Sequence, residues 1–140
     1  MSDSLILRVV TKWLVPVILL FALYVQFHGD YSPGGGFQAG VIFSSAFLLY
    51  ALVYGVDATT RVLPEAILRI GASLGVLLFA GVGVVSLFKG GAFLNYSVLA
   101  GTPVAGQHLG IILIELGVGI TVACVMLLLF YTFARTIPPQ

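Results

Sequence analysis

The stretch LGVGITVACVMLLLFYTFA, residues 116–134, contains no charged side chain. Four other stretches are equally free of charge, over residues 13–29, 31–56, 70–88 and 90–114. A helix rises about 1.5 Å per residue, so roughly 20 apolar residues cross the hydrocarbon core of a bilayer. The sequence therefore predicts an all-α integral membrane protein, with residues 1–140 forming a single domain. We expect a bundle of four transmembrane helices over about residues 5–27, 37–56, 66–87 and 107–133.

The composition excludes most other classes of protein. Of the 140 residues, 60% are hydrophobic and 8% are charged, whereas a soluble domain has about 25% charged residues. A soluble bundle would show polar faces at helical spacing, and a barrel would show alternation of apolar and polar residues. Neither pattern occurs. The net charge of +1 offers no basic stripe for nucleic acid, and the single Cys124 excludes a disulfide within the chain.

The positive charges predict how the chain is oriented. Five of the six lie on one side of the predicted spans, namely Arg8, Lys12, Arg61, Arg69 and Arg135, and Lys89 lies on the other. Because cytoplasmic loops carry an excess of Lys and Arg, we expect both termini in the cytoplasm together with the connection over residues 57–69.

Charges of alternating sign recur every four residues in that connection, at Asp57, Arg61, Glu65 and Arg69. On a continuous helix they would form a ladder of ion pairs. A solvated turn leading into the third span is the alternative, and it is the one we favour. Pro64 suits the first turn of that span.

Small residues recur at four-residue spacing on three of the predicted helices. The stripes are Gly36, Gly40 and Ser44, then Gly71 and Gly75, then Gly106 and Gly110. Such stripes allow helices to approach closely within lipid. They could serve internal packing alone, but 17 glycines exceed what four helices require, so we expect some stripes to face other subunits.

The segment HGDYSPGGGFQAG, residues 28–40, has the most unusual local sequence. Pro33 disfavours a helical conformation at Ser32, and the glycines 34, 35 and 36 allow backbone shapes closed to other residues. We expect a tight, non-helical approach to the second span. No Lys-Ser/Thr follows the glycines, which excludes a phosphate loop. A structural turn and a binding element both fit the residues.

Glu115 is the acidic residue inside a predicted span. We expect it about eight residues into the last helix, roughly 12 Å from the helix start. A carboxylate there costs about 2.5 kcal/mol or more, so it should face a bundle interior or a water-filled path. Gly119 and Ala123 follow at four-residue steps, which puts the carboxylate on a small-residue face. It could relay protons or bind a cation, which we favour, or form a fixed ion pair.

Four other polar residues are expected near the outer interface, and we count them as candidates for an ion path: His28, Asp30, Lys89 and His108. Histidines that titrate near neutral pH can carry protons. Two histidines eighty residues apart are a weak signal for zinc, so no metal site is expected. The sequence has no nucleophile–base pairing and no dinucleotide or haem signature, so we expect neither an enzyme nor a cofactor.

Two motifs carry a resemblance to a known family. GDYSPGGGFQAG, residues 29–40, and the run from His108-Leu-Gly-Ile to Ile114-Glu115-Leu-Gly-Val118 resemble the MnhB/MrpB family of small membrane proteins, which occur in Mrp (Mnh) type multisubunit Na+/H+ antiporters. The resemblance covers nearly the whole chain in length, helix number and motif order. It implies exchange of Na+ or another monovalent cation for H+, driven by the proton-motive force. It also implies that Pro33 and Phe37, in the motif that ends at Gly40, matter to the complex.

The resemblance further implies the setting of the chain. The expected partners are the other subunits of such an antiporter, the lipid bilayer, and Na+ and H+ as transported ions, in the plasma (inner) membrane of a bacterium. Related modules occur in membrane-bound hydrogenase-type complexes. Two alternatives therefore stay open: a purely structural subunit, and an ion-coupling subunit of an energy-converting redox complex.

Overall fold

The structure is a computed structural model that describes residues 4–28, 35–90 and 102–136. Within these ranges the regular elements are all helices: α1 Leu5–His28, α2 Gly36–Tyr54, α3 Val56–Val62, α4 Glu65–Phe88 and α5 Pro103–Thr136. Four of them are long and apolar enough to cross a membrane, over Leu5–Phe27, Gly36–Tyr54, Glu65–Phe88 and Leu109–Thr136. The prediction of an all-α membrane protein with four spans is confirmed.

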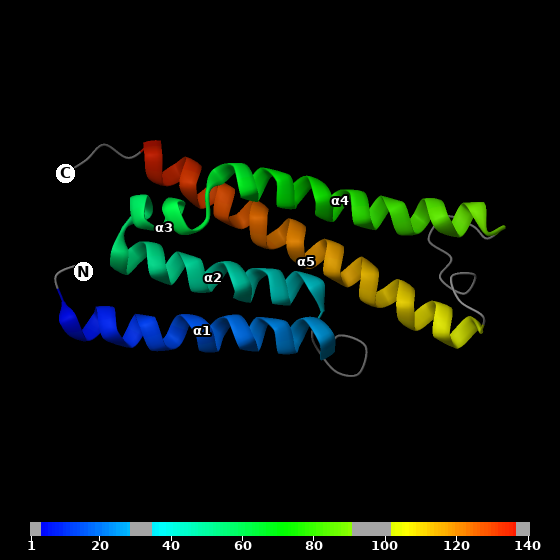
Figure 1. Cartoon of the computed structure of the whole chain (residues 1–140), viewed down its shortest axis with the longest axis horizontal. Helices are drawn as coiled ribbons and strands as arrows, with labels where there is room; N and C mark the ends of the chain where they lie inside the picture. The colour runs from blue at the N-terminus through cyan, green and yellow to red at the C-terminus, as the bar shows by residue number, and fades with distance from the viewer. Residues whose placement is uncertain (1–3, 29–34, 91–101, 137–140) are drawn as a thin grey trace.

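The four long helices lie side by side in the order α1, α2, α5, α4 (Figure 1). The last helix is thus inserted between the second and fourth, while α1 and α4 form the two flanks. The start of α1, the end of α5 and the short α3 lie at one end of the molecule (Figure 1). The helices that carry the five clustered cations therefore bring them toward that same end, as the charge pattern requires.

The helix ends depart from the predicted ones for local reasons. Helix α2 stops at Tyr54 because Gly55 adopts a φ of 96°, which helical residues do not have. Helix α5 begins at Pro103, four residues before the predicted start. Proline suits a first helical position because its missing N–H needs no partner there, and the Thr102 hydroxyl accepts a hydrogen bond from the Ala105 amide at 3.2 Å.

The charged connection is neither a full ladder nor a simple turn. Residues 56–62 form α3, and a break at Leu63 and Pro64 separates it from α4. Within α4 the Glu65 carboxylate pairs with Arg69 at 2.6 Å, which is one rung of the predicted ladder. The same carboxylate also pairs with Arg135 at 2.5 Å. This second pair, absent from the sequence-based prediction, ties the start of α4 to the end of α5.

Glycines let α2 and α4 come close to α5 from its two sides. A methyl group added to Gly40 would lie 2.8 Å from the Gly119 carbonyl oxygen on α5. One added to Gly75 would lie 2.6 Å from the Gly117 carbonyl oxygen, also on α5. Both distances are shorter than a carbon–oxygen contact allows. These stripes therefore serve packing inside the chain, and they do not support our expectation that small-residue stripes face other subunits.

A compact apolar core lies near the α3 end of the molecule. Leu68, Leu127 and Tyr131 are buried together there. The Tyr131 hydroxyl donates a hydrogen bond to the Leu63 carbonyl oxygen at 3.1 Å, which satisfies a backbone group at the break between α3 and α4. Large side chains elsewhere point outward, among them Trp13 and Phe88, and they suit contact with lipid or with other membrane proteins.

Candidate functional site at the α2–α5 crossing

Glu115 lies deeper in its helix than its sequence position predicts. Since α5 begins at Pro103, the residue is twelve positions from the helix start, or about 18 Å rather than about 12 Å. It lies level with the first residues of α2, and it is half-buried. The predicted small-residue face is present, because Gly119 and Ala123, which follow it on α5, are both buried.

The start of α2 provides the surface against which Glu115 packs. Gly35 precedes the helix with a φ of 133°, a conformation that side chains other than glycine rarely adopt. A Cβ atom on Gly35 would lie 3.4 Å from Glu115 Oε1 and 3.4 Å from Gln38 Oε1. A Cβ atom on Gly36 would collide with the Glu115 carbonyl oxygen. The glycines thus bring the α2 backbone against the α5 turn that carries the carboxylate.

This placement also has an electrostatic consequence. The first turn of a helix presents unpaired backbone N–H groups, and the helix dipole adds a partial positive charge at that end. The Glu115 side chain lies beside this end of α2.

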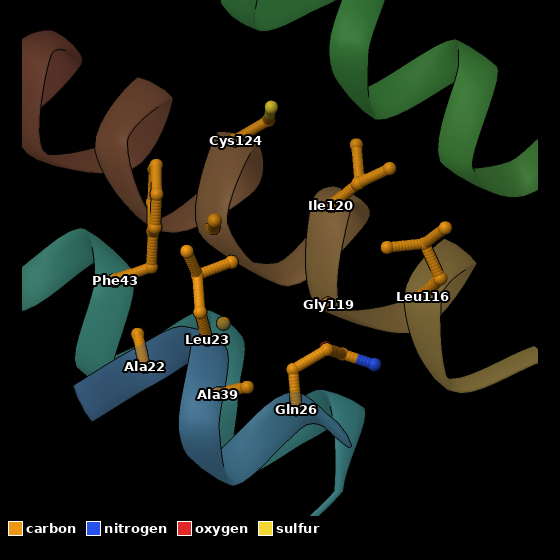
Figure 2. A pocket seen from close by; sticks show the side chains of 11 residues that line it. Ala22, Leu23, Gln26, Ala39, Phe43, Leu116, Gly119, Ile120 and Cys124 are labelled. Atoms are coloured by element: carbon orange, nitrogen blue, oxygen red, sulfur yellow. The ribbon is translucent and has the colours of Figure 1, made fainter. Parts of the chain in front are cut away.

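Gln26 on α1 joins this site, although the sequence did not single it out. The residue is only 8% exposed. Its Oε1 atom and the Gly36 carbonyl oxygen both lie within 3.3 Å of the point where a Cβ atom of Gly119 would stand. Its side chain extends from α1 toward the α5 turn of Leu116 and Gly119 (Figure 2). The available signal was a lone amide one residue before the end of the apolar span Leu5–Phe27.

An apolar cavity of about 270 Å³ adjoins Gln26, where α1, α2 and α5 meet. Small side chains leave this space, which Figure 2 shows from close by. Its lining residues are Ala22, Leu23, Gln26, Ala39, Gly40, Phe43, Leu116, Gly119, Ile120, Ala123 and Cys124. Gln26 is the amide in an otherwise apolar wall, so the polar site and the cavity are adjacent but chemically distinct.

Of the other four predicted ion-path residues, Lys89 is the one whose side chain the structure describes. Lys89 is exposed at the C-terminal end of α4. His28 ends α1 and His108 lies in the second turn of α5, with their side chains outside the described residues. Asp30 lies outside the described residues altogether, and so do Pro33 and Gly34 of the glycine motif.

Within the described ranges, no group of three or more His, Cys, Asp or Glu side chains could hold a metal ion.

Of the residues in the glycine motif, Gly35, Gly36 and Gly40 are buried, as a contact role requires. Phe37 instead points outward and is 62% exposed. Its large ring is therefore available to lipid or to another membrane protein.

Comparison with known proteins assigns the chain to a family. The family described as "Domain related to MnhB subunit of Na+/H+ antiporter" matches residues 6–128. The chain belongs to the MnhB family. Antiporter subunit mnhB2 proteins of Staphylococcus aureus strains Newman, JH1 and Mu3 are 39% identical to it over 120 residues, which are 84% of this chain and 84% of each relative.

The family match covers the whole candidate site of this MnhB chain. Gln26, Gly35 and Glu115 all fall inside the matched range of residues 6–128. The described helices α1, α2 and α4 fall within it almost completely, and the match ends near the close of α5. The site thus lies within the part of the chain that the family match covers.

Proposed function

We propose that this MnhB-family chain is a multi-pass subunit of a Na+/H+ antiporter complex in the bacterial plasma membrane, and that Glu115 carries an ion step in it. The family assignment supports the first part, together with four helices long enough to span a membrane. It makes the chain a transport component, and we infer that it catalyses no reaction by itself. The partners are then the other subunits of the antiporter, with Na+ and H+ as the transported ions. The match does not favour a role in a redox complex.

The observation that carries the second part is the position of the Glu115 carboxylate. It lies about 18 Å from the start of α5, against the glycine start of α2, where Glu115 Oε1 and Gln38 Oε1 both lie 3.4 Å from the Cβ position of Gly35. A carboxylate in such surroundings can be neutralised in two ways, by a proton or by a monovalent cation. Competition between the two for one group is the physical requirement for exchange.

The position also suggests how ion binding could be passed to neighbouring subunits. Glu115 contacts the start of α2, and the outward-facing Phe37 lies in the first turn of the same helix. A change in the charge of the carboxylate alters its attraction to the positive end of α2. The helix that presents Phe37 to its surroundings is therefore the one that senses the state of Glu115.

The test of subunit function is exchange with and without this chain. In everted vesicles from a strain lacking the gene, addition of Na+ should release less of the proton gradient than in vesicles from the complemented strain. The complex should also be recovered through a tag on this chain, with other antiporter subunits attached. Recovery of redox subunits in their place, or unchanged exchange without the chain, would contradict the proposal.

A further inference from the structure

Two cations on α1, Arg8 and Lys12, lack an acidic partner in the described part of the chain. On α4 and α5, by contrast, Arg69 and Arg135 share the Glu65 carboxylate. No described carboxylate lies within ion-pair distance of either α1 cation, and both side chains are exposed. Because α1 and α4 are the two flanks of the molecule (Figure 1), the α1 flank carries positive charge that the chain itself does not balance.

Arg8 is held in place by the end of α2. Its guanidinium carbon lies 5.1 Å from the centroid of the Tyr54 ring, and the Tyr54 hydroxyl donates a hydrogen bond to the Arg8 carbonyl oxygen at 2.7 Å. Tyr54 is itself stacked on Tyr50, with the ring centroids 4.7 Å apart. A guanidinium over an aromatic ring keeps the N–H donors at its edge available to an anion. Arg8 therefore presents hydrogen-bond donors from a fixed position.

Lys12 lies one helical turn deeper in the membrane span than Arg8. Tyr54 is the last residue of α2, so its contact with Arg8 marks the level at which the α2 span ends. Four residues on, Lys12 is about 6 Å farther into the candidate span Leu5–Phe27. A charge among lipid tails is costly, so a lysine near the end of a span extends toward the headgroups. The Cα–Cβ bonds of a helix tilt toward its N-terminus, which directs the Lys12 side chain toward Arg8.

The groups at this level indicate the class of ligand. Arg8 and Lys12 are four residues apart and therefore lie on one face of α1. The next residue, Trp13, is 76% exposed, and tryptophan rings of this kind lie at the level of the headgroups. Basic side chains at the end of a span attract anionic headgroups, and a phosphate accepts two parallel hydrogen bonds from arginine. A zwitterionic lipid has its own cation beside the phosphate, so two unbalanced positive charges favour a lipid with net negative charge.

We propose that Arg8 and Lys12 form a binding site for the phosphate of an anionic phospholipid, in the leaflet at the α3 end of the molecule. Arg8, held against Tyr54, donates hydrogen bonds to the phosphate oxygens, and Lys12 supplies a second positive charge from deeper in the span. The site is independent of the ion step at Glu115, which lies beside the opposite end of α2. It makes α1 a flank that selects its lipid neighbours by charge.

Trp13 is the single tryptophan of the chain, so its fluorescence reports the lipid beside this site. The purified full chain is reconstituted in phosphatidylcholine vesicles that contain brominated phosphatidylglycerol or, in parallel, brominated phosphatidylcholine at the same mole fraction. Bromine quenches tryptophan on contact, and the ratio of the two quenching curves gives the lipid preference. We expect phosphatidylglycerol to be favoured at least about fivefold, the effect of one basic side chain beside anionic lipid.

Three variants locate the preference. Arg8→Gln and Lys12→Gln should each lower it several-fold. Arg69→Gln is the matched control, because it removes the same charge from the same end of the molecule, at a side chain that already pairs with Glu65 at 2.6 Å. An equal loss of preference in Arg69→Gln would show that only the overall charge matters, and it would overturn the proposal. Equal quenching of the wild-type chain by the two lipids, a comparison that needs no variant, would overturn it as well.

Two further measurements distinguish the lipid from other anions. Inorganic phosphate should displace phosphatidylglycerol no more than chloride does at equal ionic strength; greater displacement would assign the cations to free phosphate instead and overturn the lipid site. The anionic lipid retained by the complex purified through this chain should fall in Arg8→Gln and stay unchanged in Arg69→Gln. Unchanged retention in Arg8→Gln would show that another subunit covers these cations, and it too would overturn the proposal.

Discussion

At the scale of single residues, Gly35 shows how a backbone conformation positions a helix against a functional side chain. Its φ of 133° places the start of α2 beside Glu115. Gly90 has a similar positive φ of 87°, but nothing lies within 4 Å of its Cβ position. A side chain at either glycine imposes backbone strain of about 1–3 kcal/mol. Only at Gly35 would that side chain also contact Gln38 and Glu115.

We therefore predict that Gly35→Val lowers exchange per intact complex at least several-fold, while Gly90→Val leaves it close to wild type. Comparison of the two variants in vesicles separates the site contact from the backbone strain that they share. Equal loss in both variants would show that strain alone is responsible, and that the contact between Gly35 and Glu115 has no role in exchange.

A second prediction at this scale concerns the contribution of Tyr131 to stability. Its hydroxyl bonds to the Leu63 carbonyl oxygen at 3.1 Å, and the side chain is 1% exposed. Tyr131→Phe leaves that carbonyl without its partner, so we expect a loss of about 1 kcal/mol in unfolding free energy. Tyr50→Phe is the control, because the Tyr50 hydroxyl makes no hydrogen bond to a described residue. Denaturant unfolding of the two variants in detergent measures the difference; equal stability would argue against the bond.

At the scale of helices, contact between α4 and α5 depends on the absence of side chains. Gly75 lies against the Gly117 carbonyl and Thr121 on α5, whereas Gly81, on the same helix, has open space around it. Within lipid the hydrophobic effect does not hold helices together, so close packing must do so.

Gly75→Leu should therefore separate α4 from α5 and lower the amount of folded chain that enters the complex. Gly81→Leu should be tolerated, since a better helix former replaces glycine at an open position, a change favourable by up to about 1 kcal/mol. Quantification of membrane-inserted chain and of assembled complex tests both. Similar losses would mean that the outer face at Gly81 is itself covered by a partner protein.

At the scale of the whole molecule, the clustering of cations at the α3 end predicts orientation. We expect that end in the cytoplasm. In a chain with Cys124→Ala, a cysteine at Thr102 should react with an impermeant thiol reagent applied to intact cells. A cysteine at Val62, which is 59% exposed on α3, should react only after the membrane is permeabilised. Labelling of a cysteine at the Val62 position in intact cells would show that the α3 end faces outward, and it would contradict the predicted orientation.

Much of this architecture was predictable, because the length and apolarity of a span follow from bilayer thickness. The number of spans, the small-residue face of Glu115 and the close-packing positions on α2 and α4 were all visible in the sequence. The order α1, α2, α5, α4 was not, since lipid-facing and helix-facing side chains are equally apolar. For the same reason Gln26 was missed: its position in an apolar span does not reveal which helix it faces.

The start of α5 was missed for a different reason. The segment before Gln107 contains glycines and a proline, which indicate a loop, yet Pro103 and Thr102 act as the start and cap of the helix. Those four extra residues place Glu115 farther from the start of its helix than the sequence predicted. The pairing of Glu65 with Arg135 was also invisible, because it joins residues seventy positions apart in the sequence.

The central claim is that Glu115 exchanges a proton against a cation. The measurement that tests it most directly is Na+-driven pH change in everted vesicles, normalised to intact complex, for Glu115→Gln and Glu115→Asp. Gln keeps the shape but cannot ionise, so exchange should be abolished in an assembled complex; Asp keeps the charge with a shorter reach and should retain part of the activity. If Glu115 is only half of a structural ion pair, Gln should reduce assembly and leave exchange per complex intact. Normal exchange in a fully assembled Glu115→Gln complex would contradict the account.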